Sequence, residues 1–238
     1  MQDFALWVYL TRTPLLWLTV TLIAYALADA LSARLGRHPL ANPVLMSVVL
    51  VGGLLVGSGT DYATYFAGAQ FVHFLLGPAT VALALPLWEN RALVAKSAVP
   101  MLAALVAGSV SAAVSALAVV WAFGAPKAVL VAIAPKSVTA GVAMSITEGM
   151  GGDPALTAVL VILTGMIGAI IVTPLMNALG IRDYRARGFA VGLASHGIGT
   201  ARAFQVDPVA GTFAGVAIGL NAVMTAVIVP GLLSFWLS

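Results

Sequence analysis

Long apolar stretches separated by short polar or glycine-rich loops fill almost the whole sequence of 238 residues. A helix needs about 20 apolar residues to cross a bilayer, so the pattern predicts about seven or eight transmembrane segments. We expect uninterrupted helices at 14–35, 43–56, 91–123, 154–179 and 208–237. Three more apolar stretches carry proline, glycine or charge in their middle, and there we expect broken helices: 62–88, 125–150 and 182–204. The predicted fold is an all-α, transporter-like membrane protein forming a single domain over 1–238.

The three interruptions fall near Gly77-Pro78, at Pro135 and at Gly197-Ile198-Gly199. Proline removes a backbone hydrogen bond and clashes with the preceding turn, so each half of such a segment is a short helix. A broken segment followed by a span occurs three times, at 62–123, 125–179 and 182–237. Interrupted apolar segments in corresponding positions are typical of inverted repeats that surround a transporter binding site.

The basic loops constrain the topology. Loops rich in lysine and arginine favour the cytoplasmic side, which applies to Arg34 with Arg37 and to the 182–187 loop. If every segment crossed once, these two loops would lie on opposite sides. One broken segment before residue 182 must therefore re-enter the membrane and return, and both 62–88 and 125–150 satisfy this requirement. Non-helical backbone at membrane depth is tolerated only against protein or a water-filled cavity.

Composition narrows the class of protein. Hydrophobic residues make up 61% of the chain and charged residues only 8%, which excludes an ordinary soluble domain. No basic run indicates nucleic-acid binding, and the absence of cysteine excludes disulfides and thiolate metal sites. No basic region precedes the first apolar stretch, so we expect no cleavable signal peptide. Motifs of hydrolases, metalloproteases and nucleotide-binding loops are missing, and we expect neither an enzyme, a cofactor nor a metal site.

Lys136 is the most informative residue of the second broken segment. A cation at membrane depth costs about 2.5–3.5 kcal/mol and indicates a functional site by default. Pro135 is well placed to begin a half-helix, whose first amides carry a partial positive charge. A lysine there is repelled unless an anion is bound, and Ser137 and Thr139 add hydroxyl donors. The alternative is that Lys136 pairs with a structural carboxylate; Glu148 is a poor partner, about 18 Å away along a helix.

Arg202 marks the third broken segment. Gly197 and Gly199 allow the backbone to approach a ligand closely, and Thr200 offers a hydroxyl at the start of the next half-helix. Helical side chains lean toward the N-terminus, so the Arg202 guanidinium is expected to reach the break and bind a carboxylate in two places. The alternative is that it reaches the membrane interface, toward Asp207.

Other polar residues at membrane depth are weaker candidates. His196 has a side chain able to carry a proton near neutral pH, although a structural hydrogen-bonding role is favoured. Pro78, Thr80 and Asn221 are expected to line the same polar cavity. The series Gly211, Gly215 and Gly219 on the last span predicts close helix packing.

These motifs resemble those of a known family. Pro135-Lys136-Ser137-Val138-Thr139, followed by Ile146-Thr147-Glu148 and Gly151-Gly152, is similar to the LrgB/CidB family. Ala194-Ser195-His196-Gly197-Ile198-Gly199-Thr200-Ala201-Arg202 also resembles that family, with glycine at 197 where alanine is expected. The resemblance extends from about residue 40 to the end.

The resemblance implies two functions. Bacterial relatives carry labels as antiholin-like proteins or modulators of murein hydrolase export, often beside a small LrgA/CidA-like membrane protein. The related plastid protein is a glycolate/glycerate translocator, and bacterial members are tied to uptake of pyruvate and similar acids. The resemblance therefore implies a multi-pass protein of the bacterial inner membrane, in contact with lipid, with a separate LrgA/CidA-like partner; a homo-oligomer is compatible with it.

Two hypotheses follow. The first is a carrier of small 2-hydroxy or 2-oxo monocarboxylates that works by alternating access, with Lys136 and Arg202 on the carboxylate. Ser137, Thr139 and Thr200 would then serve the hydroxyl or oxo group. The second is a holin-like or antiholin-like protein that modulates murein hydrolase export and lysis, in which the polar breaks would serve assembly or gating.

Overall fold

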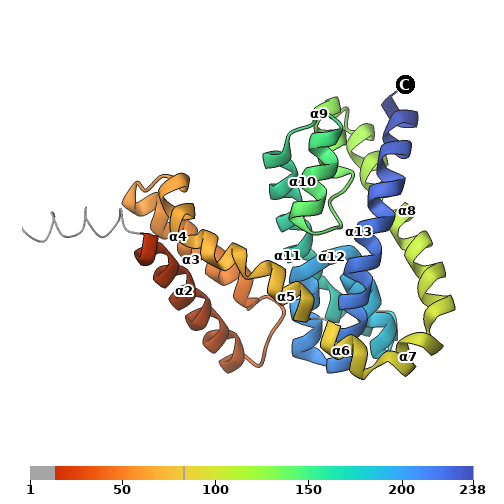
Figure 1. Cartoon of the computed structure of the whole chain (residues 1–238), viewed down its shortest axis with the longest axis horizontal. Coiled ribbons are helices and arrows are strands. Elements are labelled where there is room, and N and C mark those ends of the chain that lie inside the picture. The colour runs from red at the N-terminus through yellow and green to blue at the C-terminus, as the bar shows by residue number, and fades with distance from the viewer. Residues whose placement is uncertain (1–13, 83, 238) are drawn as a thin grey trace, which may run out of the picture. The chain divides into compact units, whose positions relative to one another are not determined.

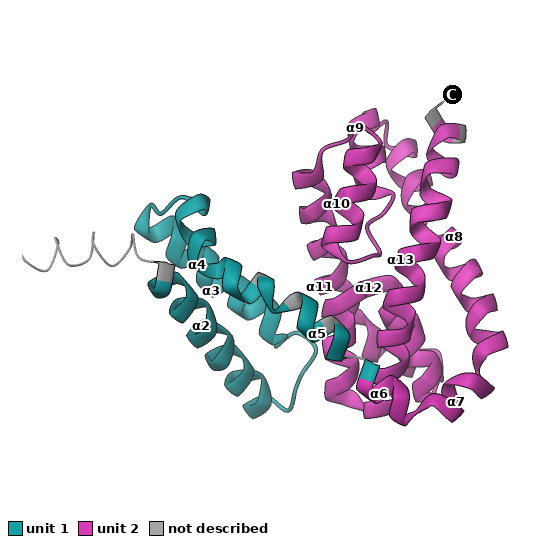
Figure 2. Cartoon of the chain, in the orientation of Figure 1, with its two compact units in different colours: residues 1–84 teal, residues 85–238 magenta. Residues whose placement is uncertain are grey.

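The computed structural model describes residues 14–82 and 84–237, without the side chains of Pro14, His73, Leu76, Thr80, Phe235 and Leu237. The described residues form helices joined by short loops, and no strand occurs among them (Figure 1). The chain divides into two compact units, residues 1–84 and 85–238 (Figure 2). The first unit contains α2 (Pro14–Arg34), α3 (Pro43–Ser58), α4 (Tyr62–Phe74) and α5 (Leu76–Ala82). Helix α6 (Ala84–Glu89) begins at the boundary.

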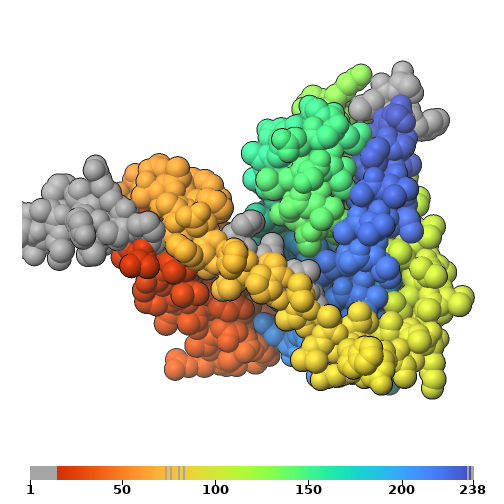
Figure 3. Space-filling model, in the orientation of Figure 1, coloured from red at the N-terminus to blue at the C-terminus, as the bar shows by residue number. Residues whose placement is uncertain are grey.

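The second unit contains the two later broken segments. Its helices after α6 are α7 (Arg91–Lys96), α8 (Ala98–Ala122), α9 (Lys127–Ile133), α10 (Ala140–Gly149), α11 (Pro154–Ala178), α12 (Tyr184–Val206) and α13 (Pro208–Leu237). In the space-filling view, α13 packs beside α9 and α10 (Figure 3).

Five helical stretches are long and apolar enough to cross a membrane. They are Leu15–Arg34, Tyr62–Glu89, Ala98–Ala122, Pro154–Ala178 and Pro208–Ser234, and the shorter α3 is apolar as well. The predicted all-α, multi-pass membrane protein is therefore confirmed. In the first broken segment the helix is interrupted at Leu75, and Pro78 lies inside the first turn of α5 rather than at the break.

Side-chain caps fix where the long helices begin. The side chains of Asn42, Asp153, Asp183 and Asp207 each accept a backbone N–H of the helix that follows, at 2.8–2.9 Å. Three of these caps are followed directly by proline, whose fixed φ suits the first helical position. The ion pairs among the described residues are Asp29–Arg37 and Asp183–Arg185, so the predicted approach of Arg202 to Asp207 does not form an ion pair there.

Helices α9 and α10 form a re-entrant hairpin. Lys127 and Ala128, at the start of α9, line the same cavity as Met150 and Asp153, at the end of α10. The chain therefore enters along α9, turns at residues 134–139 and returns along α10 to the side from which it came (Figure 1). We call it hairpin 1. Of the two segments that satisfy the topology, 125–150 is thus one that re-enters.

Helix α12 forms a second re-entrant hairpin, here called hairpin 2. Gly188 packs against the backbone of Ala210, and Gly192 packs against the backbone of Ala214. The first half of α12 therefore runs parallel to α13. Since α13 begins right after α12 ends, the second half of α12 must run back toward the starting side. Each half is about 15 Å long, half the thickness of the hydrocarbon core.

The two hairpins open toward opposite ends of α11. The open end of hairpin 1 adjoins the start of α11, and the open end of hairpin 2 adjoins its end. Because α11 crosses between them, 125–179 and 182–237 are two hairpin-then-span units of opposite direction. If α3, the 62–89 stretch, α8 and α11 each crossed once, a count along the sequence would put the Arg34–Arg37 loop and the 182–187 loop on one side, as the positive-inside rule requires.

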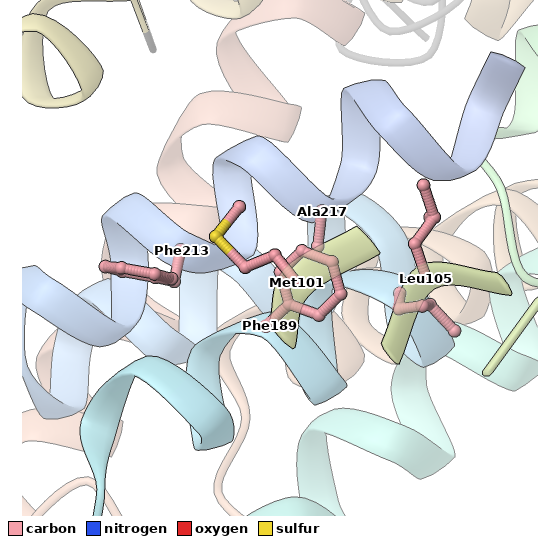
Figure 4. Close-up of a cluster of buried hydrophobic side chains, with 6 residues drawn as sticks. Met101, Leu105, Phe189, Phe213 and Ala217 are labelled. Atoms are coloured by element: carbon pink, nitrogen blue, oxygen red, sulfur yellow. The ribbon is translucent and has the colours of Figure 1, made fainter. Parts of the chain in front are cut away.

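An apolar cluster fixes α8 and hairpin 2 against α13. Met101 and Leu105 of α8 meet Phe189 of hairpin 2 and Phe213 and Ala217 of α13 (Figure 4). The close approach of α12 to α13 depends on Gly188 and Gly192, since a Cβ at either would collide with backbone. The close helix packing predicted for Gly211, Gly215 and Gly219 is present at the first of these glycines and absent at the last. Gly211 contacts the Phe204 ring, whereas Gly219 has open space where a Cβ would lie.

Candidate functional site at the hairpin tips

The tip of hairpin 1 is the Pro135–Thr139 turn. Pro135 and Val138 are fully buried, and Lys136 is half-buried. The Lys136 Nζ donates a 3.4 Å hydrogen bond to Ser137 Oγ. Within the described part of the chain, ion pairs form at Asp29–Arg37 and Asp183–Arg185, and Lys136 pairs with no carboxylate. The structural alternative for Lys136 therefore finds no partner among the described residues.

Helix α10 has its N-terminus at the tip of hairpin 1. Thr139 occupies the N-cap position with extended backbone (φ −58°, ψ 146°). Among the described atoms, its side chain makes no capping hydrogen bond, so it leaves the first amides of α10 available. Gly141 is exposed, with open space where a Cβ would lie. Amides and the partial positive charge of a helix N-terminus favour an anion.

The tip of hairpin 2 lies at Ser195 and His196. Both have non-helical backbone angles, and His196 has φ 40° and ψ −136°, a conformation that favours glycine. The break was predicted at Gly197–Gly199 and lies directly before these residues, because His196 rather than a glycine turns the chain. Gly197 follows as the exposed first residue of the returning half-helix. Each returning half-helix thus has an exposed glycine in its first turn.

Contacts of the His196 ring hold this turn in place. Nε2 lies 2.9 Å from Val161 O of α11, and since a carbonyl only accepts, Nε2 carries the proton. Thr200 Oγ1 donates to His196 O at 3.0 Å. Gly165 and Gly168 of α11 leave room for His196 and Ser195, respectively. The favoured structural role of His196 agrees with these contacts, and a proton-carrying role stays a prediction.

The two tips meet at the same point of α11 and α13. Val138 of hairpin 1 packs against Val161, the residue whose carbonyl binds His196 of hairpin 2. Asn221 Nδ2 donates to Ser137 O of hairpin 1 at 3.2 Å and to Leu193 O of hairpin 2 at 2.9 Å. Both re-entrant turns are therefore attached to one side chain of α13.

Asn221 is fully engaged in hydrogen bonds. Its Oδ1 accepts from Ser109 at 2.6 Å and from Thr225 at 3.2 Å, and only 1% of the residue is exposed. From the sequence, we expected Asn221 to line a polar cavity. The structure gives it another task, because each polar atom of its amide already has protein partners. Its signal in the sequence is an amide in the middle of an otherwise apolar helix.

Arg202 lies away from the tips. It is 8% exposed, and Nη1 donates to Gln205 Oε1 at 3.5 Å, toward the open end of hairpin 2. A cavity of about 20 Å³ brings Arg202 together with Tyr184, Arg187 and Val206 at that end. The expectation that its guanidinium leans back to the break is therefore not met; the fold-back of α12 gives it near neighbours at the opposite end.

The other predicted residues fall into three groups. Ser137, Gly197, Gly199 and Thr200 lie at the tips; Ser137 and Thr200 are buried, and Gly199 packs against Val191 and Ser195. Pro78 lies in the first unit, so its membership of this site stays a prediction. The Thr80 side chain lies outside the described ones. Within the described residues, no cluster of His, Asp and Glu forms a metal site.

The chain is similar to known proteins over most of its length. The sequence model of the LrgB-like family matches residues 21–235. Uncharacterized protein YwbG of Bacillus subtilis is 34% identical over 92% of this chain and 96% of its own length. Holin-like protein CidB of Staphylococcus aureus is 30% identical, and that of Staphylococcus epidermidis 29%, each over 92% of this chain and 95% of its own length. No solved structure matches.

Proposed function

The chain belongs to the LrgB-like family, and we propose that it is a carrier of small 2-hydroxy or 2-oxo monocarboxylates such as glycolate, glycerate, lactate or pyruvate. One observation supports this proposal above the others. Two hairpins that open toward opposite ends of α11 meet at their tips beside the Lys136 turn, and Asn221 joins these tips. Transporters place substrate sites near the midplane between inverted repeats, with half-helix N-termini toward anionic groups.

The chemistry of the tips suits a small carboxylate. The N-termini of α10 and of the second half of α12 both begin at the hairpin tips. Each positive helix end stabilises an anion by about 0.3–1 kcal/mol when exposed and up to about 2 kcal/mol when partly buried. Lys136 adds a full charge, and Ser137 and Thr139 offer hydroxyls to a 2-hydroxy or 2-oxo group. We assign Arg202 to the stability of hairpin 2 rather than to the carboxylate.

The relatives' names favour a second candidate function. Two of them are named holin-like proteins, and a holin-like or antiholin-like role in murein hydrolase export and lysis would come to this chain by similarity. A location in the bacterial inner membrane and a separate LrgA/CidA-like partner belong to either function. The two functions differ in the need for Lys136, because a pore tolerates the loss of one anion contact better than a carrier does.

Uptake into proteoliposomes tests the proposal. Purified protein is expected to take up labelled C2–C4 monocarboxylates with saturation, and Lys136→Ala is expected to abolish that uptake. Lys127→Ala is the matched control, since it removes a lysine from the open end of the same hairpin. Release of unrelated solutes without saturation, unchanged in Lys136→Ala, would contradict the carrier and support the holin-like function.

A further inference from the structure

A cavity of about 760 Å³ lies between α8 and the first half of hairpin 2. At one end it is lined by Lys96, Asp183 and Arg185, which belong to the side of the basic 182–187 loop. At depth it is lined by Ser111 and by Ala194, the exposed residue directly before the turn of hairpin 2. Its volume falls in the range of about 300–1,000 Å³ that small-molecule sites occupy.

The cavity reaches the level of the hairpin tips. Ser115, its farthest residue along α8, lies between Ala113 and Leu117. These two neighbours pack in the same apolar cluster as Ala134, which directly precedes the Pro135–Thr139 turn. The cavity therefore extends from the basic loop to the depth at which both hairpins end.

Helix α8 shows different residue types on its two exposed sides. Toward the cavity it carries mostly small residues: Pro100, Met101, Ala104, Gly108, Ser111, Ala112 and Ser115. The hydroxyls of Ser111 and Ser115 donate to carbonyls of the same helix. Away from the cavity it exposes valine and leucine: Val99, Leu102, Val106 and Val110 are 37–79% exposed. Large aliphatic side chains are what lipid tails favour, and exposed hydroxyls are better suited to water. The same helix thus separates a side with large aliphatic residues from a side with mostly small residues and two exposed serines.

Leu193 lines the inner part of the cavity. Its side chain fills the space beside Gly108, where a Cβ would lie 2.9 Å from Leu193 Cδ1. Its carbonyl is the group that binds Asn221. Leu193 therefore lines the cavity and is also connected, through the side-chain amide of Asn221, to Ser137 at the tip of hairpin 1.

Resting on the proposed function, we propose that this cavity is the water-filled path by which small monocarboxylates reach the hairpin tips from the basic-loop side. Two cations against one carboxylate at its mouth favour anions over cations. The weakly polar wall suits a path, because a solute that bound tightly on the way would not move on.

Cysteine labelling tests this proposal, and the natural chain contains no cysteine to remove. Ser111→Cys is the test position, and Val110→Cys is the matched control, one residue away and turned off the cavity. Arg182→Cys marks the basic-loop side. In membrane vesicles of known orientation, water-soluble methanethiosulfonate reagents are expected to modify Ser111→Cys from the side that modifies Arg182→Cys. Val110→Cys is expected to react at least about tenfold more slowly, because lipid excludes the charged reagent.

The charge at the mouth gives a second readout. Lys96→Gln is expected to lower the ratio of anionic to cationic reagent rates at Ser111→Cys by about twofold at low ionic strength, because one charge about 20 Å away in water changes the two rates in opposite directions by about 1.4-fold each. Lactate or pyruvate is expected to slow the modification of Ser111→Cys. Equal rates at positions 110 and 111, modification from the opposite side, or rates unaffected by both Lys96→Gln and the acids would each overturn the proposal. Labelling does not require transport. The labelling test of the path can therefore fail while the uptake test of the carrier succeeds, and uptake can fail while labelling succeeds.

Discussion

Asn221→Asp is the most informative single change, because it alters hydrogen bonding while keeping the shape of the side chain. The amide donates to Ser137 O and Leu193 O, and a carboxylate has no N–H to replace it. Even a protonated carboxyl group donates only once, so at least one carbonyl loses its partner. A buried polar group left unpaired costs about 1–3 kcal/mol. We therefore expect a loss of about 1–3 kcal/mol of unfolding free energy with one orphaned carbonyl, and about 2–6 kcal/mol with two.

Reversible unfolding in mixed detergent micelles measures this loss, followed by the fluorescence of the chain's five tryptophans. Thr225→Val is the matched control, since it removes one donor to Asn221 Oδ1 while Ser109 continues to donate there. It should cost only about 0.5–1.5 kcal/mol. If Asn221→Asp lost less than about 0.5 kcal/mol, or no more than Thr225→Val, Asn221 would not join the two hairpins as described.

Three further changes test the hairpins separately. Gly188→Ala should cost about 1–3 kcal/mol in an unfolding titration because its Cβ meets the α13 backbone, whereas Gly197→Ala has open space and should cost clearly less; equal losses would refute the packing. His196→Gly should be about 1–2 kcal/mol more stable than His196→Ala, because both lose the ring and only glycine accepts the positive φ without strain; a more stable alanine variant would argue against the strained turn. Hydrogen bonds from Arg185 lower the pKa of Asp183 in the folded protein. The contribution of Asp183 to the unfolding free energy is therefore present above its unfolded pKa and is lost as pH falls through the lower folded pKa. The unfolding free energy should fall less steeply with acid in Asp183→Asn, and an unchanged acid titration would contradict this.

The fold was largely predictable, because the length of each apolar run predicts a helix and the prolines and glycines within a run predict its interruption. Apolar runs mark the spans, and Pro135 marks the turn of hairpin 1. The direction of each broken segment was not predictable in the same way. A re-entrant hairpin and a kinked span have the same residues in the same order. The difference appears only in packing, such as Gly188 beside Ala210 and Gly192 beside Ala214.

The position of Lys136 at a break was predictable, but the prediction that a half-helix begins at Pro135 was wrong, because Lys136 lies in the turn and α10 begins at Ala140. A cation after a proline in an apolar stretch is a local signal, and the structure places it at a hairpin tip. The position of Arg202 depends on the fold-back of α12, and the role of Asn221 depends on partners 28 and 84 residues away. Sequence spacing carries no information on such distant partners.

Equilibrium binding of labelled monocarboxylates to the purified protein tests the central claim most directly. We expect saturable binding of at least one C2–C4 acid, weakened about tenfold or more in Lys136→Gln, since a charge-assisted hydrogen bond contributes about 1.5–3 kcal/mol. Lys127→Gln should bind like the natural chain. Equal affinity in Lys136→Gln and the natural chain would contradict a carboxylate held at the hairpin tips.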